Sequence, residues 1–325
     1  MTRGTKIFRI MISVLLALTM LISAFFVLLV CVGISKESYG IYVAGVKITR
    51  SNEDDVLGDG TVYYNDNTNI LVFDNATIAS EETVVYSKID LQIQLIGENK
   101  LICTGETSAT GIYAGDYNLN KDLAILGDGS LTVEIPNASG EAAGICAANL
   151  TIASAITVVT PDCENMAHGI VCASSLMIVD NGDVVVKNGA SNYSSAVRVR
   201  GSAFFEEGTS LEISANPGCT GICKGFTVSG DLFMGKNTTL DVSIADDATD
   251  LGECIRISGL MEVGVGSTVN ASAKNAYAIE CFGAIEANKD AVISAVSDQN
   301  AADIFCSGRV INCGAQIHGE MDASE

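Results

Sequence analysis

The chain contains no tryptophan, only 3 prolines and only 2 histidines, His168 and His318. The scarcity of proline excludes a collagen-like chain or a proline-rich spacer. Two histidines leave little scope for a histidine-rich metal site. Aromatic residues make up 6% of the sequence, which is low for a protein that stacks rings on its ligand. Apolar residues are plentiful, at 48% of 325 with a mean hydropathy of +0.34, as in packed or membrane-attached proteins rather than disordered ones.

Positive charge is also scarce. The sequence has 18 Lys and Arg against 39 Asp and Glu, a net charge of −21, and every acidic residue follows position 35. A surface this acidic repels phosphate backbones, so we expect no nucleic-acid partner. It favours solubility and opposes self-association, so we expect a monomer. It could also attract divalent cations.

The amino end predicts export. Three basic residues within the first nine positions precede an uncharged, apolar run at 10–34. This run exceeds the usual secretory core of about 7–15 residues and suffices to span a bilayer, which takes about 20. We therefore predict that residues 1–35 are a signal anchor with a cytoplasmic tip, and that the rest lies on the extracellular face. The alternative is a signal peptide cleaved near Gly33 or Ser35, which would release a secreted protein.

An internal repeat dominates the rest of the chain. A small residue followed by an aliphatic one recurs every 24 to 33 residues, and two shorter alternating segments lie between most recurrences. The recurring pairs are Gly111-Ile112, Gly144-Ile145, Gly169-Ile170, Ala196-Val197, Gly221-Ile222, Cys254-Ile255, Ala278-Ile279 and Asp303-Ile304. Alternation of period two bounded by Gly, Asn, Asp or Ser predicts strands rather than helices.

Three short strands in each repeat of about 25 residues predict an all-β parallel β-helix, a solenoid of about nine coils over residues 81–325. A β-sandwich is the alternative, but it does not require a near-constant step. In the solenoid, the residue two places beyond each recurring aliphatic residue should point inward. These residues are Ala114, Ala147, Cys172, Val199, Lys224, Ile257, Cys281 and Cys306. Lys224 is the exception, which predicts that the register slips beside Gly225 or that the coil opens there.

Residues 36–80 are predicted to form a separate N-terminal β cap. Thr61–Tyr64 and Ile70–Phe73 should pair as a hairpin over Asn65–Asn69. A cap would cover the unpaired strand edges that an open solenoid end exposes.

The runs Gly40–Val46, Asp55–Tyr64 and Ile70–Ile78 resemble a module of exported Firmicutes surface proteins. In those proteins the module precedes a right-handed parallel β-helix. The solenoid pattern is similar to the pectate-lyase-like superfamily and to bacterial β-helix carbohydrate-binding proteins. The resemblance implies a right-handed coil, and it carries no functional residue across. Enzymes of this fold use carboxylate clusters for calcium binding or acid–base catalysis, often with an arginine nearby.

Candidate ligand-binding residues follow from the repeat register. Arg198 and Arg256 each come directly after a recurring aliphatic residue, so both should face outward, two coils apart. Glu280 should follow Arg256 one coil later. These residues could form a patch for an anionic sugar or for catalysis. Alternatively, Arg256 and Glu280 form a cross-coil ion pair worth less than about 1 kcal/mol.

A calcium site is a further hypothesis. One of the longer coils carries Asp246, Asp247 and Asp250 shortly before Glu253. Calcium takes six to eight oxygen ligands, which clustered carboxylates can supply. The alternative is a solvated acidic loop. We assign no cofactor, with Ca²⁺ as the one candidate ion.

Ten cysteines follow Cys31, which is unusual for an exported chain. By the predicted register, Cys281 and Cys306 stack inside adjacent coils, where Cα atoms about 4.8 Å apart could accept a disulfide. Alternatively, these cysteines are small apolar fillers of the core.

We therefore expect a bacterial cell-surface β-helix protein without catalytic activity, which binds carbohydrate or cell-wall polysaccharide or acts in adhesion. The first alternative is a polysaccharide lyase or hydrolase. It would need three or more carboxylates and a basic residue on one face of the solenoid. The second alternative is a passive structural surface protein without a ligand.

Overall fold

A computed structural model describes residues 38–116, 118–215, 222–244, 251–274, 277–298 and 302–323. Every regular element in these residues is a β-strand, which confirms the predicted all-β class. The described ranges contain no helix long and apolar enough to cross a bilayer. The predicted signal anchor at 1–35 lies outside them.

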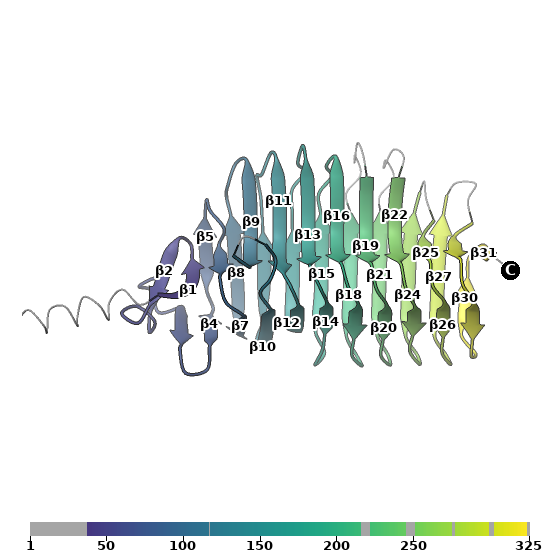
Figure 1. Ribbon diagram of the computed structural model, residues 1–325, viewed down its shortest axis with the longest axis horizontal. Helices are drawn as coiled ribbons and strands as arrows, with labels where there is room; N and C mark the ends of the chain where they lie inside the picture. The colour runs from purple at the N-terminus through teal and green to yellow at the C-terminus, as the bar shows by residue number, and fades with distance from the viewer. Residues whose placement is uncertain are drawn as a thin grey trace, which may run out of the picture.

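The chain winds into a parallel β-solenoid of about eight turns, against about nine predicted. In Figure 1 successive turns follow one another along the long axis, from the purple N-terminal end to the yellow C-terminal end. Most complete turns contribute three short strands, and each pairs in parallel with the equivalent strand of the next turn. The strands therefore form three rows, which we call sheet A, row B1 and row B2.

Sheet A holds twelve strands, of which the first two are antiparallel to their neighbours. In spatial order they are β2 (Val46–Thr49), β1 (Ser38–Val43), β6 (Val85–Ser87), β9 (Ser108–Ala114), β11 (Glu141–Ala147), β13 (Met166–Cys172), β16 (Tyr193–Val199), β19 (Ile222–Val228), β22 (Leu251–Ile257), β25 (Ile279–Cys281), β28 (Ile304–Cys306) and β31 (Met321–Ala323).

Rows B1 and B2 share two long strands that bend from one row into the other, β10 (Leu123–Glu134) and β12 (Leu150–Val159). Row B1 also contains β3 (Val62–Asn65), β4 (Ile70–Asp74), β7 (Leu91–Ile96), β14 (Leu176–Ile178), β17 (Ala203–Phe205), β20 (Leu232–Met234), β23 (Met261–Val263), β26 (Ile285–Ala287) and β29 (Val310–Asn312). Row B2 also contains β5 (Thr77–Ser80), β8 (Glu98–Cys103), β15 (Asp183–Asn188), β18 (Ser210–Ala215), β21 (Thr239–Ile244), β24 (Thr268–Ala273), β27 (Val292–Ser297) and β30 (Gln316–His318).

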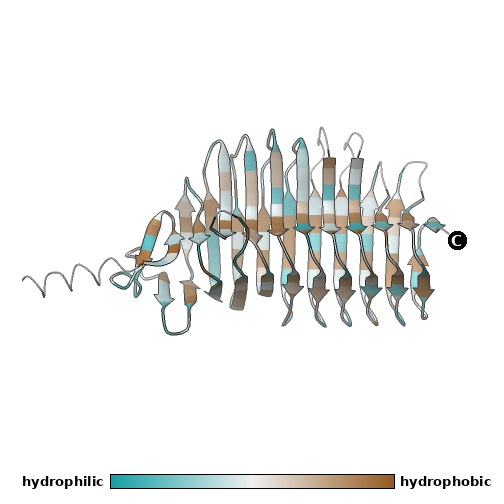
Figure 2. Cartoon of the chain, viewed as in Figure 1, coloured by the Kyte–Doolittle hydropathy of each residue, from teal (hydrophilic) through white to brown (hydrophobic). Residues whose placement is uncertain are grey.

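The strands alternate between core and surface, and Figure 2 shows this alternation of hydrophobic and hydrophilic residues. In β18, Leu211 and Ile213 are buried while Glu212 between them is exposed. The register places Leu211 beside Leu240 of the next turn and Ile213 beside Val242. Burying each such side chain contributes about 1.5–3 kcal/mol. The core is therefore a continuous aliphatic column that each turn extends.

The turn containing Lys224 corrects the predicted register. Val197 pairs with Phe226, and Phe226 pairs with Ile255, so the recurring pair of this turn is Gly225-Phe226 rather than Gly221-Ile222. The predicted slip beside Gly225 is thus confirmed, and Lys224 faces outward. A small residue is needed at position 225, because a Cβ there would lie 2.5 Å from both the Cys254 carbonyl oxygen and Val242 Cγ1.

The N-terminal strands belong to the solenoid's own sheets. The predicted hairpin is present, with β3 and β4 antiparallel. However, β4 also pairs in parallel with β7, and β5 pairs with β8, so parallel pairing begins at Ile70 rather than at the predicted boundary of 81. Strand β1 pairs antiparallel with β6 at this end of sheet A.

The cysteines of the core are small buried fillers. Cys281 and Cys306 stack in register inside adjacent turns, as predicted, and both are fully buried. Neither forms a disulfide. Burial raises the pKa of the Cys281 thiol to about 12, which keeps it protonated and unreactive at neutral pH.

Substitution of Phe226 tests the corrected register. Phe226 is fully buried and stacks on Phe205 with ring centroids 6.0 Å apart. We expect Phe226→Ala to lower the free energy of unfolding by about 3–5 kcal/mol through the cavity it leaves. Urea denaturation followed by circular dichroism would measure this change.

The matched control is Phe204→Ala. Phe204 stacks on Phe233 but is 37% exposed on the outer face of β17. We expect this variant to lose about 1 kcal/mol. If Phe226→Ala and Phe204→Ala lowered the free energy of unfolding equally, the corrected register would be contradicted.

Candidate functional site

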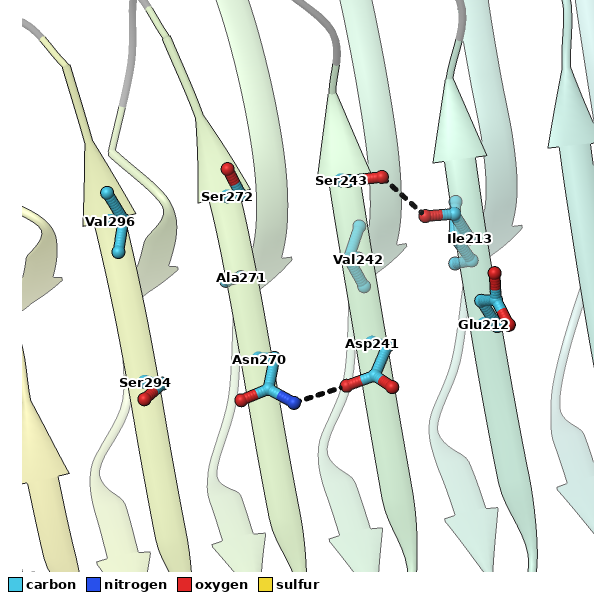
Figure 3. A pocket seen from close by; sticks show the side chains of 10 residues that line it. All are labelled: Glu212, Ile213, Asp241, Val242, Ser243, Asn270, Ala271, Ser272, Ser294 and Val296. Atoms are coloured by element: carbon cyan, nitrogen blue, oxygen red, sulfur yellow. Dashed lines mark hydrogen bonds between the residues drawn. The ribbon is translucent and has the colours of Figure 1, made fainter.

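A groove of about 520 Å³ crosses the outer face of row B2, over strands β18, β21, β24 and β27 (Figure 3). Its walls are formed by outward-facing side chains at equivalent positions of successive turns. One ladder runs through Glu212, Asp241, Asn270 and Ser294. A parallel ladder two residues further along each strand contributes Ser243, Ser272 and Val296.

The groove is acidic and rich in hydrogen-bonding groups. Glu212 and Asp241 lie side by side on adjacent strands, and Asn270 Nδ2 donates a hydrogen bond of 2.6 Å to Asp241 Oδ1. This bond holds the carboxylate and leaves the Asn270 amide oxygen as an acceptor. The outward-facing side chains of the lining are carboxylates, an amide, hydroxyls and one valine, and none is basic. Such a surface suits a ligand with many hydroxyl groups and does not suit a polyanion.

The sequence-predicted residues lie together on a different face, the outer surface of sheet A. The register runs Arg198, Thr227, Arg256, Glu280 across four adjacent strands. The predicted two-coil separation of the arginines is therefore confirmed. Thr227 occupies the position between them, where the uncorrected register had placed Cys223.

The expected cross-coil ion pair is also present. Arg256 Nη1 lies 3.5 Å from Glu280 Oε2, and its guanidinium lies over the Phe282 ring with 4.9 Å to the centroid. The pKa of Glu280 is raised, because burial outweighs the opposing effect of Arg256. Arg256 and Glu280 therefore belong to a partly buried network of charged side chains and do not form an isolated, solvent-exposed ion pair.

Glu253 joins this network. Its carboxylate contacts Arg256 on the same strand and lies 2.7 Å from Lys224 Nζ on the preceding strand. The Lys224 contact is an ion pair between side chains that are both largely buried. The predicted calcium ligands Asp246, Asp247 and Asp250 lie outside the described residues. Within the described ranges, no group of three or more acidic, histidine or cysteine side chains is placed to hold a metal ion.

Sequence reasoning missed two surface features. The first is the groove, whose residues look in the sequence like ordinary outward positions of strands. The second is a row of tyrosines at the N-terminal end of sheet A. Tyr42, Tyr86 and Tyr113 follow one another with ring centroids 5.7 and 5.9 Å apart. The repeat spacing could have revealed that Tyr86 and Tyr113 are neighbours, because they lie one coil apart. It could not have revealed Tyr42, whose strand pairs antiparallel with that of Tyr86.

Comparison with known proteins adds no identification: no protein-family model, curated protein or solved structure matches the chain.

The ion-pair network should contribute measurably to stability. The side chains of Lys224 and Glu253 are only 17% and 19% exposed. Glu253→Gln would leave two partly buried cations without a common counterion, and we expect a loss of about 1–3 kcal/mol in urea denaturation. Asp290→Asn is the control, because the Lys289–Asp290 pair is 75% and 70% exposed. No measurable change is expected there, and similar losses for both variants would contradict the assignment.

His168 should titrate below the ordinary histidine value of 6.5. Burial lowers its pKa, and Arg198 adds to the effect. The imidazole is therefore neutral in the folded chain at a pH where the unfolded chain is protonated. Its contribution to stability is present above pH 6.5 and is lost as the pH falls toward the folded pKa.

An NMR titration of the imidazole signals would measure this pKa. With only two histidines, His318→Gln assigns the spectrum. Arg198→Gln should raise the pKa of His168, and an unchanged value in that variant would show that the guanidinium does not act on the ring.

Proposed function

We propose that this protein is a non-catalytic bacterial surface protein that binds glycan chains in the row B2 groove. The observation that carries the proposal is the groove itself, a hollow that crosses four successive turns and carries carboxylates, an amide and hydroxyls. Its volume of about 520 Å³ lies within the range of about 300–1,000 Å³ that ligand pockets occupy.

The shape of the groove suits an oligosaccharide. Three strand spacings of about 4.8 Å separate β18 from β27, so the groove is about 14 Å long across the turns. The equivalent positions along it present a repeating series of acceptors and hydroxyls. A polymer of similar sugar units would meet similar groups at each strand, which favours an extended chain over a single small molecule.

The chemistry of the lining supports a neutral or amino-bearing glycan. Glu212 and Asp241 accept hydrogen bonds and would repel carboxylated or sulfated chains. Two carboxylates without a basic partner fall short of the cluster that a lyase or hydrolase of this architecture would need. Export by the apolar N-terminal run would bring the groove to the cell surface.

The test is a glycan array probed with the purified full chain, followed by affinity measurements on the ligands found. We expect Asn270→Ala to weaken binding about five- to tenfold, because it removes one donor and frees Asp241. Thr157→Ala is the matched control, since Thr157 occupies the same ladder two strands before Glu212 and does not line the groove.

Adding and removing Ca²⁺ in the same assay tests the candidate ion. Release of reducing or unsaturated ends would show an enzyme. Absence of binding to any neutral or amino-bearing glycan would overturn the proposal.

A further inference from the structure

Three buried polar atoms in the described residues have neither a hydrogen bond nor an ion pair: His168 Nδ1, Ser195 Oγ and Thr227 Oγ1. All three lie on the outer face of sheet A, on the consecutive strands β13, β16 and β19. A buried polar group left without a partner is destabilising, because it has lost its hydrogen bonds to water. The presence of all three on one small area of the described surface indicates that a polar partner belongs there.

The two hydroxyls sit in a square of four outward side chains on neighbouring strands. Strand β16 supplies Ser195 and Arg198, and β19 supplies Lys224 and Thr227. Ser195 pairs in register with Lys224, and Arg198 pairs with Thr227. Hydroxyls therefore occupy one diagonal of the square and cations the other, with strands about 4.8 Å apart. Ser195 is fully buried among these larger neighbours.

The charges around the square are not balanced. Glu253 and Glu280 are engaged by Lys224 and Arg256. No carboxylate of the described residues forms an ion pair with Arg198. In a chain with a net charge of −21, three cations and two carboxylates on four adjacent strands form a locally positive area.

From this geometry we infer that the square formed by Ser195, Arg198, Lys224 and Thr227 is a binding site for a tetrahedral oxoanion, a phosphate or sulfate group. Guanidinium and ammonium groups only donate hydrogen bonds, and both hydroxyls can donate as well. Four donors on two adjacent strands can offer hydrogen bonds to an ion whose oxygen acceptors point in several directions. Partial exposure of Arg198 and Lys224 gives the ion a route from the outer surface.

Isothermal titration calorimetry of the full chain with inorganic phosphate and with sulfate tests this inference, at an ionic strength held constant with chloride. We expect saturable binding. The double variant Ser195→Ala with Thr227→Val should raise the Kd at least about tenfold, because hydrogen bonds to a charged group are lost. Arg198→Gln should weaken binding to a similar extent.

A structural role for the hydroxyls predicts a different result. Both hydroxyls lack partners, so their removal should leave the anion-free protein as stable as before or slightly more stable. Loss of stability in the anion-free double variant would overturn the inference. Sulfate also stabilises proteins generally by exclusion from their surface, but that effect would be equal in all variants.

The matched control is Lys187→Gln with Ser214→Ala. These residues form an adjacent cation–hydroxyl pair on the outer face of row B2, without a second pair to complete a square. The control should bind phosphate as the unaltered chain does. Absence of binding, or equal binding by the Ser195→Ala with Thr227→Val variant, would overturn the inference.

The source of the oxoanion is distinguished by comparing free sulfate with dextran sulfate, with neutral dextran as the blank. Tighter binding of the polymer, abolished in the double variant, would assign the site to an esterified chain. Equal affinity per sulfate group would assign it to the free ion. The inference does not rest on glycan binding in the row B2 groove, so failure of either one leaves the other standing.

Discussion

A single turn of this chain has no way to bury its own inner face, and stacking of successive turns supplies the missing partner. Leu211, for example, lies beside Leu240 of the next turn, and inward positions of the other central strands that the structure describes repeat that relation. Parallel pairing at about 4.8 Å then satisfies the backbone hydrogen bonds of each strand with those of its neighbours. Each added turn therefore extends both the core and the sheets. A cavity within one turn, for example at Phe226, also removes contacts from the turns on either side.

The same stacking decides the chemistry of the surface. Residues separated by one repeat in sequence become neighbours about 4.8 Å apart, so each outer position becomes a ladder across the molecule. On row B2 the ladders gather carboxylates, an amide and hydroxyls into an acidic groove. On sheet A they gather Arg198, Lys224 and Arg256 into a positive area within an acidic protein. The two faces therefore differ in the sign of their local charge, although both are built from the same repeat.

The turn around Lys224 shows where reasoning from sequence reached its limit. Gly221-Ile222 and Gly225-Phe226 both fit the recurring pattern locally, and the anomaly of an inward lysine was the one sign of a wrong choice. Pairing of Phe226 with Val197 and Ile255 resolves it, because that register divides the span into two equal steps of 29 residues. The corrected register turns Cys223 inward and brings Lys224 and Thr227 outward beside Arg198. Without this shift, neither the ion pair with Glu253 nor the square around Ser195 could be recognised.

Periodicity alone was enough to predict the parallel solenoid, the inward stack of Cys281 on Cys306 and the pairing of Arg256 with Glu280, because each depends on repeat spacing and on alternation along a strand. The groove and the unpartnered hydroxyls required the tertiary structure. Whether Glu212 lies beside Asp241 in a hollow, and whether Ser195 is covered by its neighbours, depends on the lengths and directions of side chains in adjacent turns. Strands β4 and β5 already belong to the parallel rows because they pair with β7 and β8, about 20 residues further along the chain. The local sequence pattern of β4 and β5 does not specify these partners.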